Sequence, residues 1–267
     1  MDAKLIFDVG AHKGEDTDFY LEKGFRVVSV EANAQLAQGL RERFATALVS
    51  GRLTIVEAAV AEREGEIEFF QNEDVSVWGT IYPNWAERNA GMGTRSIKVK
   101  VRAVTFDSLL REHGIPYFLK VDIEGADMLC VSALETVSTK PRFVSVEATK
   151  TSWKNLVAEF NVFRRLGYTR FKVVNQSYVE HQIEPSPARE GDTTGHRVLP
   201  DSSGLFGRDL PDPWLTRSQA LRKYFAIFAQ YRFFGDNTWG NKMARRLPWK
   251  YQRRILPDWY DTHAARP

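Results

Sequence analysis

The stretch LIFDVGAHKG, residues 5–14, decides the fold. Its first half is an apolar run typical of a buried strand, and Gly10 and Gly14 then enclose a short loop that leads into a helix at Glu15. Such a loop brings the backbone close to a ligand where the first strand of an α/β sheet meets its helix. The G-x-x-x-G spacing differs from the G-x-G-x-x-G of dinucleotide-binding folds, and Asp8 directly before it favours a cationic ligand over a pyrophosphate. Taken alone, the loop is equally compatible with a plain strand-to-helix turn.

Further apolar, β-branched runs follow this strand, and segments with helical spacing separate them. The best helix begins at Asn33, a suitable N-cap, and places Leu36, Leu40, Phe44 and Leu48 on one face. This alternation predicts an α/β fold with a parallel sheet. The strand runs are LIFDV, FRVVSVEA, LTIVEAAV, YFLKVDI, FVSVEA and RFKVV.

Two regions depart from simple alternation. Between residues 65 and 105, EIEFF and IKVKVRAV read as strands around a polar loop, 71–95, which we expect to overhang the sheet edge. Residues 184–213 are rich in Pro, Gly, Ser and Asp and lack periodicity, as in a long loop. We therefore divide the chain into an α/β domain at 1–180 and a C-terminal extension at 181–267.

Glu31 ends the second strand run, at the position where a carboxylate can accept hydrogen bonds from both hydroxyls of a ribose. The alternative is an exposed acid at a strand end, which the apolar residues before it disfavour. Ala58 and Ala59 end the third run and are small enough to lie against a flat adenine.

The segment FLKVDIEGAD places Lys120, Asp122 and Glu124 at alternate positions, which predicts that they share one face of a strand end. A purely structural strand of a parallel sheet is buried on both sides and reads as a continuous apolar run. Three charges here therefore favour a functional role over a structural one.

These motifs together resemble the FkbM-type methyltransferases: DVGAHKG, VEAN, TFDSLL and LKVDIEGAD occur in the order and spacing of that family, from Leu5 to about Tyr168. The resemblance implies a Rossmann-like class I methyltransferase fold with a seven-stranded, mostly parallel sheet and helices on both faces. It also implies S-adenosylmethionine as methyl donor and, in most members, O-methylation of a sugar or natural-product hydroxyl.

Carried over to this chain, the resemblance places Asp8, Gly10, Ala11, Gly14 and Glu31 at the cofactor, and Asp122 and Glu124 beside the transferring methyl group. We add Ala59 and His12 to the cofactor residues. His12 departs from the family pattern, which has a small polar residue such as Asn there, although an imidazole can also donate a hydrogen bond.

A hydroxyl acceptor needs a base, and Asp122 is our first choice, followed by Glu124, with Lys120 orienting the carboxylates. The alternative is that Asp122 and Glu124, with Glu147 at the end of the next strand run, hold a divalent cation that activates the hydroxyl. The sequence does not distinguish a base from a metal ligand. The lone loop histidine His181 is more typical of a solvated surface residue.

We expect the atom that accepts the methyl group to be oxygen in preference to nitrogen or carbon. The chain has no N-P-P-Y or D-P-P-Y run for exocyclic amines, and its single cysteine, Cys130, excludes a C-x-x-x-C-x-x-C cluster.

On the acceptor side we expect a lid formed by SSGLFG, residues 202–207. The predicted substrate contacts are Ser202, Ser203, Trp214 and His196, and a solvent-exposed loop is the alternative.

Residues 217–254 carry ten Lys or Arg and one acid, Asp236, so the rest of the chain has 27 basic and 33 acidic residues. Nine aromatic residues are interspersed, a mixture suited to anionic glycans, lipid headgroups or single-stranded nucleic acid. The favoured interpretation is that these aromatics pack as a helix on the domain, with the basic residues as its solvated face. Peripheral contact with a membrane or an anionic glycan stays open.

Three function classes follow: a sugar, glycolipid, polysaccharide or natural-product O-methyltransferase, an RNA methyltransferase that uses the basic tail, and a non-catalytic cofactor-binding module. We favour the first, with a small-molecule or glycan acceptor, and disfavour nucleic acid. The single cysteine, the lack of a long apolar run and the lack of a visible export signal predict a cytoplasmic protein.

Overall fold

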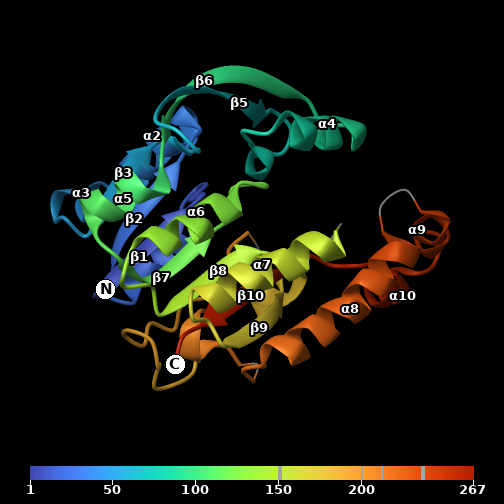
Figure 1. Ribbon diagram of the computed structural model, residues 1–267. Helices are drawn as coiled ribbons and strands as arrows, with labels where there is room; N and C mark the ends of the chain where they lie inside the picture. Colours follow the sequence, from blue (N-terminus) through green and yellow to red (C-terminus); the bar gives the residue numbers. More distant parts are fainter. Residues whose placement is uncertain (150–151, 200, 212, 236–237) are drawn as a thin grey trace.

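The computed structural model describes residues 1–149, 152–199, 201–211, 213–235 and 238–267 (Figure 1). Its main sheet has seven strands in the order β3-β2-β1-β7-β8-β10-β9, and β10 alone runs antiparallel to its neighbours. The prediction of a seven-stranded, mostly parallel sheet is confirmed. The strands are β1 (Asp2–Val9), β2 (Arg26–Glu31), β3 (Leu53–Glu57), β7 (Pro116–Val121), β8 (Phe143–Glu147), β9 (Arg170–Asn175) and β10 (Tyr260–Ala265).

Strand β1 lies inside the sheet between β2 and β7, which fits the apolar run of residues 5–9, buried on both sides. One core cluster joins this sheet to the helices on its first face, α5 (Phe106–His113), α6 (Asp127–Ala133), α7 (Trp153–Arg165) and α8 (Arg217–Phe234). A second cluster lies on the opposite face, under α1 (Glu15–Glu22) and α2 (Ala34–Arg43). Both faces are thus covered by helices, as predicted.

Helix α2 begins at the predicted N-cap, since the side chain of Asn33 accepts hydrogen bonds from the backbone N–H groups of Gln35 and Leu36. The expected continuous helix is interrupted at Phe44, where φ is −110°, and α3 (Ala45–Val49) follows. The Phe44 ring lies over Gly14, where an added Cβ would come within 2.5 Å of it. The interruption therefore accompanies packing of this ring against the first loop.

A second, three-stranded sheet lies above the main one and contains β4 (Ala59–Val60), β5 (Gly65–Asn72) and β6 (Ser96–Val104) in the order β4-β6-β5. The run LTIVEAAV is therefore divided between two sheets. The predicted polar loop contains the 3₁₀ turn η1 (Ser76–Trp78) and helix α4 (Pro83–Gly91). We call residues 59–104 the β-arm, which arches over the carboxyl ends of the central strands in Figure 1.

The segment 179–210 fills the second face of the sheet where no helix covers it. Leu205 and Phe206 are buried, and the Phe206 ring stacks on Phe118 with centroids 4.6 Å apart. The buried ammonium of Lys23 at the end of α1 anchors this segment through ion pairs with Glu184 and Asp209. Most of SSGLFG is therefore core packing and not the expected lid.

The chain ends with α8, α9 (Trp239–Ala244), α10 (Trp249–Ile255) and β10, after the short turns η3 (Gln176–His181) and η4 (Gly207–Asp209). Strand β10 lies between β8 and β9, so residues beyond 180 complete the sheet of the first domain. The division at residue 180 stays a prediction. No helix in the described part of the chain is long and apolar enough to span a membrane.

Candidate active site

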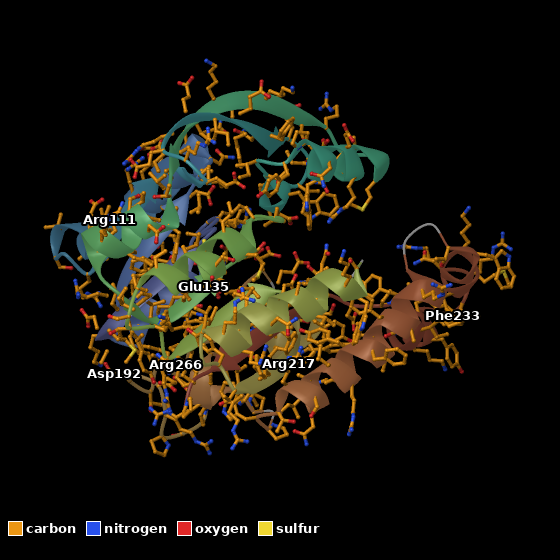
Figure 2. All side chains as sticks on the ribbon, viewed as in Figure 1. Arg111, Glu135, Asp192, Arg217, Phe233 and Arg266 are labelled. Carbon is orange, nitrogen blue, oxygen red and sulfur yellow. The ribbon has the colours of Figure 1, made fainter. Side chains whose placement is uncertain are left out.

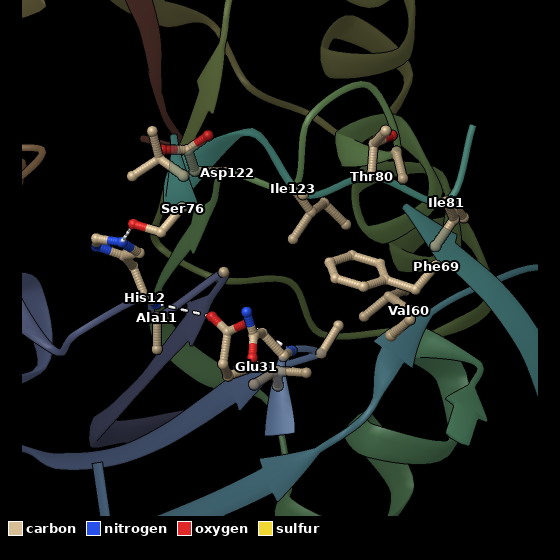
Figure 3. A pocket seen from close by; sticks show the side chains of 18 of the residues that line it. Ala11, His12, Glu31, Val60, Phe69, Ser76, Thr80, Ile81, Asp122 and Ile123 are labelled. Carbon is tan, nitrogen blue, oxygen red and sulfur yellow. Dashed lines mark hydrogen bonds between the residues drawn. The ribbon is translucent and has the colours of Figure 1, made fainter. Parts of the chain in front are cut away.

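A cavity lies at the carboxyl ends of β1, β2 and β7, beneath the β-arm (Figure 3). Its volume is about 860 Å³, including space open to solvent. The predicted residues that line it are Gly10, Ala11, His12, Glu31, Ala59, Lys120 and Asp122. The structure therefore brings together most of the residues that the sequence assigned to the cofactor.

The loop from β1 to α1 approaches the end of β7 closely. Gly10 has φ 83°, and a Cβ placed on it would lie 1.9 Å from the carbonyl oxygen of Asp122. Only glycine fits there, because both the left-handed backbone and the contact exclude a side chain. His12 follows with φ 51°, which is unusual for a residue with a side chain.

The carboxylate of Glu31 holds this loop in place from the end of β2. It accepts hydrogen bonds from the backbone N–H groups of His12 and Asn33, each at 2.8 Å. Burial raises the pKa of Glu31, whose side chain lines the cavity. A carboxylate has about four lone-pair positions, so two bonds leave capacity for ligand hydroxyls.

Lys120 lies under the same loop, buried in a cluster of opposite charge. Its ammonium donates a hydrogen bond to the carbonyl oxygen of Gly10 at 2.9 Å and lies 3.2 Å from Asp8 and 3.7 Å from Asp16. Although burial alone would lower it, the pKa of Lys120 is held above its usual range by these two carboxylates. Lys120 is therefore a fixed cation.

Asp8 lies below the cavity and does not line it. Its carboxylate is fully buried and accepts a hydrogen bond from the hydroxyl of Thr17 at 2.7 Å. With the Lys120 ion pair, these contacts make Asp8 a support for the site. Gly14 likewise lies outside the cavity lining, against Leu40 and Phe44.

Asp16 is a cavity residue that the sequence analysis missed. It belongs to the first turn of α1, lines the cavity and accepts a hydrogen bond from the backbone N–H of Ser203 at 2.9 Å. Burial raises the pKa of Asp16 to about 7, although Lys120 acts in the opposite direction. The only signal in the sequence was the pair Glu15–Asp16 directly after the glycine loop.

Asp122 lines both the cavity and a wider groove beside it. The groove runs between the β-arm and the helices α7 and α8, and its floor carries the carboxylates Glu124, Glu147 and Asp261. Its aromatic lining residues are Trp78, Trp153, Phe225, Phe228, Tyr231, Phe233 and Trp259. Asp122, together with Val77 and Asp201, therefore lies where a ligand in the cavity and a second ligand in the groove would meet.

Glu124 turns the chain away from β7 with φ 48°. Burial, together with the nearby carboxylates of Glu147 and Asp122, raises the pKa of Glu124 to about 9. The same causes raise the pKa of buried Asp127 to about 8. Thr80 of the β-arm donates a hydrogen bond to the Glu124 carbonyl oxygen at 2.8 Å, so the arm contacts the end of β7 directly.

The predicted acceptor residues separate into two groups. Ser202 and Ser203 line the groove, whereas His196 and Trp214 line neither the groove nor the cavity. His196 Nδ1 lies 2.8 Å from Glu22, and Trp214 stacks on Phe143 with centroids 5.9 Å apart. Both side chains pack against the second face of the sheet.

Within the described ranges, no group of three or more His, Cys, Asp or Glu side chains is arranged to hold a metal ion. Asp122, Glu124 and Glu147 border the same groove without forming such a group. A role for them as metal ligands stays a prediction.

Comparison with known proteins adds independent information. The family model described as the methyltransferase FkbM domain matches residues 8–170. Among solved structures, a methyltransferase FkbM from Methylobacillus flagellatus KT is 16% identical over 64% of this chain and 39% of that chain, with a TM-score of 0.43. The chain thus spans well under half of that relative.

Two further structures match nearly the whole chain. A SAM-dependent methyltransferase from Archaeoglobus fulgidus is 10% identical over 98% of this chain and 86% of that one, with a TM-score of 0.39. A structure described as StiE O-MT residues 961–1257 is 11% identical over 100% and 70%, with a TM-score of 0.42. No curated protein matches the sequence. Because the family model covers more than half of its residues, the chain belongs to the FkbM methyltransferase family.

Proposed function

We propose that the chain is an S-adenosylmethionine-dependent O-methyltransferase that acts on a hydroxyl group of a sugar, a glycolipid or polysaccharide, or a natural product. The observation that carries the proposal is the position of Asp122, which lines both the cavity and the groove. A transfer reaction needs two adjacent binding sites that meet at the reacting atoms. The cavity and the groove are such a pair of sites, and Asp122 lies between them.

The residues of the cavity fit the proposed cofactor. Glu31 has free lone pairs for ribose hydroxyls, and the small side chains of Ala58 and Ala59 leave room for a flat ring. Asp122 adds a carboxylate that favours a cationic ligand. When bound, S-adenosylmethionine supplies an activated methyl carbon on a positively charged sulfur.

We assign Asp122 as the base that accepts the proton of the acceptor hydroxyl. Glu124 has a pKa of about 9, so it is protonated at neutral pH and is a donor there instead of a base. The supporting residues act through the backbone: Lys120 fixes Gly10, and Gly10 contacts the backbone of Asp122. These contacts hold Asp122 at the boundary of the two sites.

The groove favours an uncharged acceptor over RNA. Its lining contains five carboxyl groups, Asp122, Glu124, Glu147, Asp201 and Asp261, and two arginines, Arg88 and Arg232. Glu124 is protonated at neutral pH, and burial raises the pKa of Asp261 well above its usual range. The lining therefore offers a polyanion no net positive charge, whereas hydroxyl groups can bond to carboxyl groups and sugar rings can stack on the aromatic side chains. The acidic lining therefore supports the carbohydrate or natural-product alternative.

Cofactor binding and methyl transfer can be tested separately with one variant. We expect Asp122→Asn to bind S-adenosylhomocysteine within about threefold of the wild type by calorimetry. Transfer of tritiated methyl to glycolipid and polysaccharide fractions from cells lacking the gene should fall by about 10²-fold or more. Asp107→Asn, on the remote helix α5, is the matched control and should keep both activities.

The outcomes distinguish the alternatives. Failure of the wild type to bind either S-adenosylmethionine or S-adenosylhomocysteine would refute the cofactor assignment. Unchanged transfer by Asp122→Asn would refute the base assignment. If transfer by the wild type is lost in EDTA and restored by Mg²⁺, the metal-ligand alternative replaces the base.

A further inference from the structure

Helices α8, α9 and α10 form a lobe, residues 217–235 and 238–256, that projects beyond the sheet in Figure 1. The first half of α8 belongs to the core, because Ala220, Tyr224 and Ile227 are buried and the Tyr224 hydroxyl lies 2.7 Å from that of Thr262. The second half of α8 extends outward and carries the two shorter helices. The chain returns from α10 directly into β10, so the lobe is joined to the sheet at both of its sequence ends.

Hydrogen bonds from side chains to backbone carbonyl oxygens hold the outer part of the lobe together. The hydroxyl of Thr238 donates a hydrogen bond to the carbonyl oxygen of Phe233 at 3.0 Å, which places the end of α8 beside the start of α9. The side chain of Gln252 on α10 donates to the carbonyl oxygens of Arg245 and Leu247. The exposed side chains on these three helices therefore belong to one unit.

This unit exposes an unusual amount of apolar surface. Trp239 is 77% exposed and Phe233 is 65% exposed, and Figure 2 shows Phe233 at the outer part of the lobe. Among the side chains that the structure describes, the exposed large apolar ones on the lobe are Phe225, Phe233, Trp239, Met243, Leu247 and Tyr251. Exposed apolar groups gathered in this way mark an interaction surface.

Positive charge accompanies this apolar surface. The exposed basic residues whose side chains the structure describes are Arg222, Lys223, Arg232, Lys242, Arg245, Arg246 and Lys250. Among the described residues, none of these seven has a carboxylate within ion-pair distance, in contrast to Lys98 and Lys100 of the β-arm. Asp236, the one acid of this segment, lies outside the described residues. The ammonium of Lys223 donates a hydrogen bond to the carbonyl oxygen of Val173 in the sheet, and the other charges of the lobe are available to an anionic partner.

We propose that the lobe docks on the surface of an anionic lipid bilayer, with its exposed apolar side chains in the headgroup region and its Lys and Arg residues on the lipid phosphates. Protein surfaces that bind the membrane interface combine exposed aromatic and aliphatic side chains with Lys and Arg. Each Lys or Arg near an anionic surface adds to the affinity, and the effect decreases over a Debye length.

The observations favour a lipid surface over single-stranded nucleic acid. Met243 and Leu247 have no ring on which a base can stack, yet both are exposed beside the aromatic residues. Lipid headgroup regions accept both kinds of apolar side chain.

The groove opens onto the same helix, since Phe225, Phe228 and Arg232 of α8 contribute to its lining. A lobe seated on a bilayer would therefore bring the groove to an acceptor that is attached to a lipid. This consequence depends on the proposed function, whereas the docking of the lobe does not.

Vesicle sedimentation tests the docking without any catalytic step. We expect the wild type to sediment with vesicles of 30% phosphatidylserine in phosphatidylcholine and to remain in the supernatant with pure phosphatidylcholine. The triple variant Lys242→Gln/Arg246→Gln/Lys250→Gln should bind about 10²-fold more weakly, on the basis of the contribution of each basic residue. The control Arg63→Gln/Arg111→Gln/Arg170→Gln removes the same charge from exposed positions elsewhere and should bind as the wild type does.

A second measurement reports on the apolar contact. Brominated phospholipids should quench the tryptophan fluorescence of the bound wild type, and Trp239→Phe should reduce that quenching without loss of sedimentation. Equal binding of the two triple variants, equal binding to neutral vesicles, or preference for a single-stranded RNA over the anionic vesicles would overturn the proposal. S-adenosylhomocysteine calorimetry on the same samples checks the fold and keeps failure of docking distinct from failure of the proposed activity.

Discussion

The Nε2 atom of His12 lies 2.8 Å from the hydroxyl oxygen of Ser76, and this contact joins the β1–α1 loop to the β-arm (Figure 3). His12 is at the same time held by the Glu31 carboxylate through its backbone N–H. One residue thus connects the floor of the cavity with the segment that covers it. His12, which departs from the family pattern, therefore makes a side-chain contact of its own in this chain.

We expect Ser76→Ala to weaken the binding of S-adenosylhomocysteine by about fivefold, because one net hydrogen bond contributes about 1 kcal/mol. The control is Ser50→Ala, whose hydroxyl donates to the carbonyl oxygen of Ala47 away from the cavity. Calorimetry on both variants gives the comparison. Equal affinities for the two would show that the His12–Ser76 contact does not support the cavity.

Gly10→Ala should destabilise the protein by several kcal/mol more than Gly51→Ala. Both glycines have a left-handed backbone, with φ 83° and 69°, but an added Cβ meets Asp122 at position 10 and nothing within 4 Å at position 51. The Gly51 variant thus measures the conformational cost alone, about 1–2 kcal/mol. Urea unfolding of both variants gives the difference, and equal losses would contradict the close approach.

Lys120→Met should cost about 3–5 kcal/mol of folding stability, because it leaves Asp8 and Asp16 buried without their cation. The matched change Lys98→Met removes an exposed ion pair with Glu68 and should cost less than about 1 kcal/mol. Adding Asp8→Asn to the Lys120 variant should recover part of the loss. A loss that is no larger than that of the surface variant would contradict the buried cluster.

Glu124→Gln should raise the melting temperature above that of the wild type, and the gain should grow from pH 5 to pH 8.5. The folded wild type keeps this carboxyl protonated up to a pKa of about 9, whereas the unfolded chain ionises near its ordinary value. The folded state therefore binds more protons over this window, and its stability falls as the pH rises. Glutamine has no proton to lose and escapes this penalty.

At pH 8 we expect a difference of at least about 3 °C, which corresponds to about 1 kcal/mol for a chain of this size. Thermal unfolding followed by circular dichroism at several pH values gives the curve. The exposed Glu112→Gln serves as a control and should not change with pH in this way. A gain that is constant from pH 5 to pH 8.5 would contradict the raised pKa of Glu124.

The sequence predicted most of the site because the carboxyl ends of parallel strands meet at one edge of a sheet. Glu31 and Asp122 each end an apolar run, so recognising the two runs was enough to place both side chains near Gly10. The burial of charged side chains could not be predicted in this way. Lys120 shares a strand face with Asp122, and Asp8 shares one with Gly10, yet Lys120 and Asp8 form a buried ion pair beneath the loop.

Strand β10 was not predicted, because its sequence YDTHAA has no apolar run of its own. Its pairing with β8 and β9 decides its conformation, and its polar side chains find partners only in the folded sheet. His263, for example, lies 3.2 Å from the hydroxyl of Ser145, and burial beside Lys172 lowers the pKa of His263 to about 3. Such long-range partners leave no local pattern.

The segment 202–207 shows a second limit of prediction from the sequence. Two apolar residues within a polar loop are compatible with either a lid or a core contact, and the stacking of Phe206 on Phe118 decides for the core. The substrate roles of His196 and Trp214 stay predictions, although both pack away from the cavity and the groove.

The position of β10 also sets the order in which the protein can be completed during synthesis. Residues 176–259 separate the end of β9 from the start of β10, and a ribosome needs about 4–17 s to add a segment of that length. Until β10 emerges, β8 and β9 each present an unpaired edge to the cell, which is the kind of edge that invites aggregation. We expect the nascent chain to be most prone to aggregation during that interval, and Asp261 joins the groove only when β10 has paired with both strands.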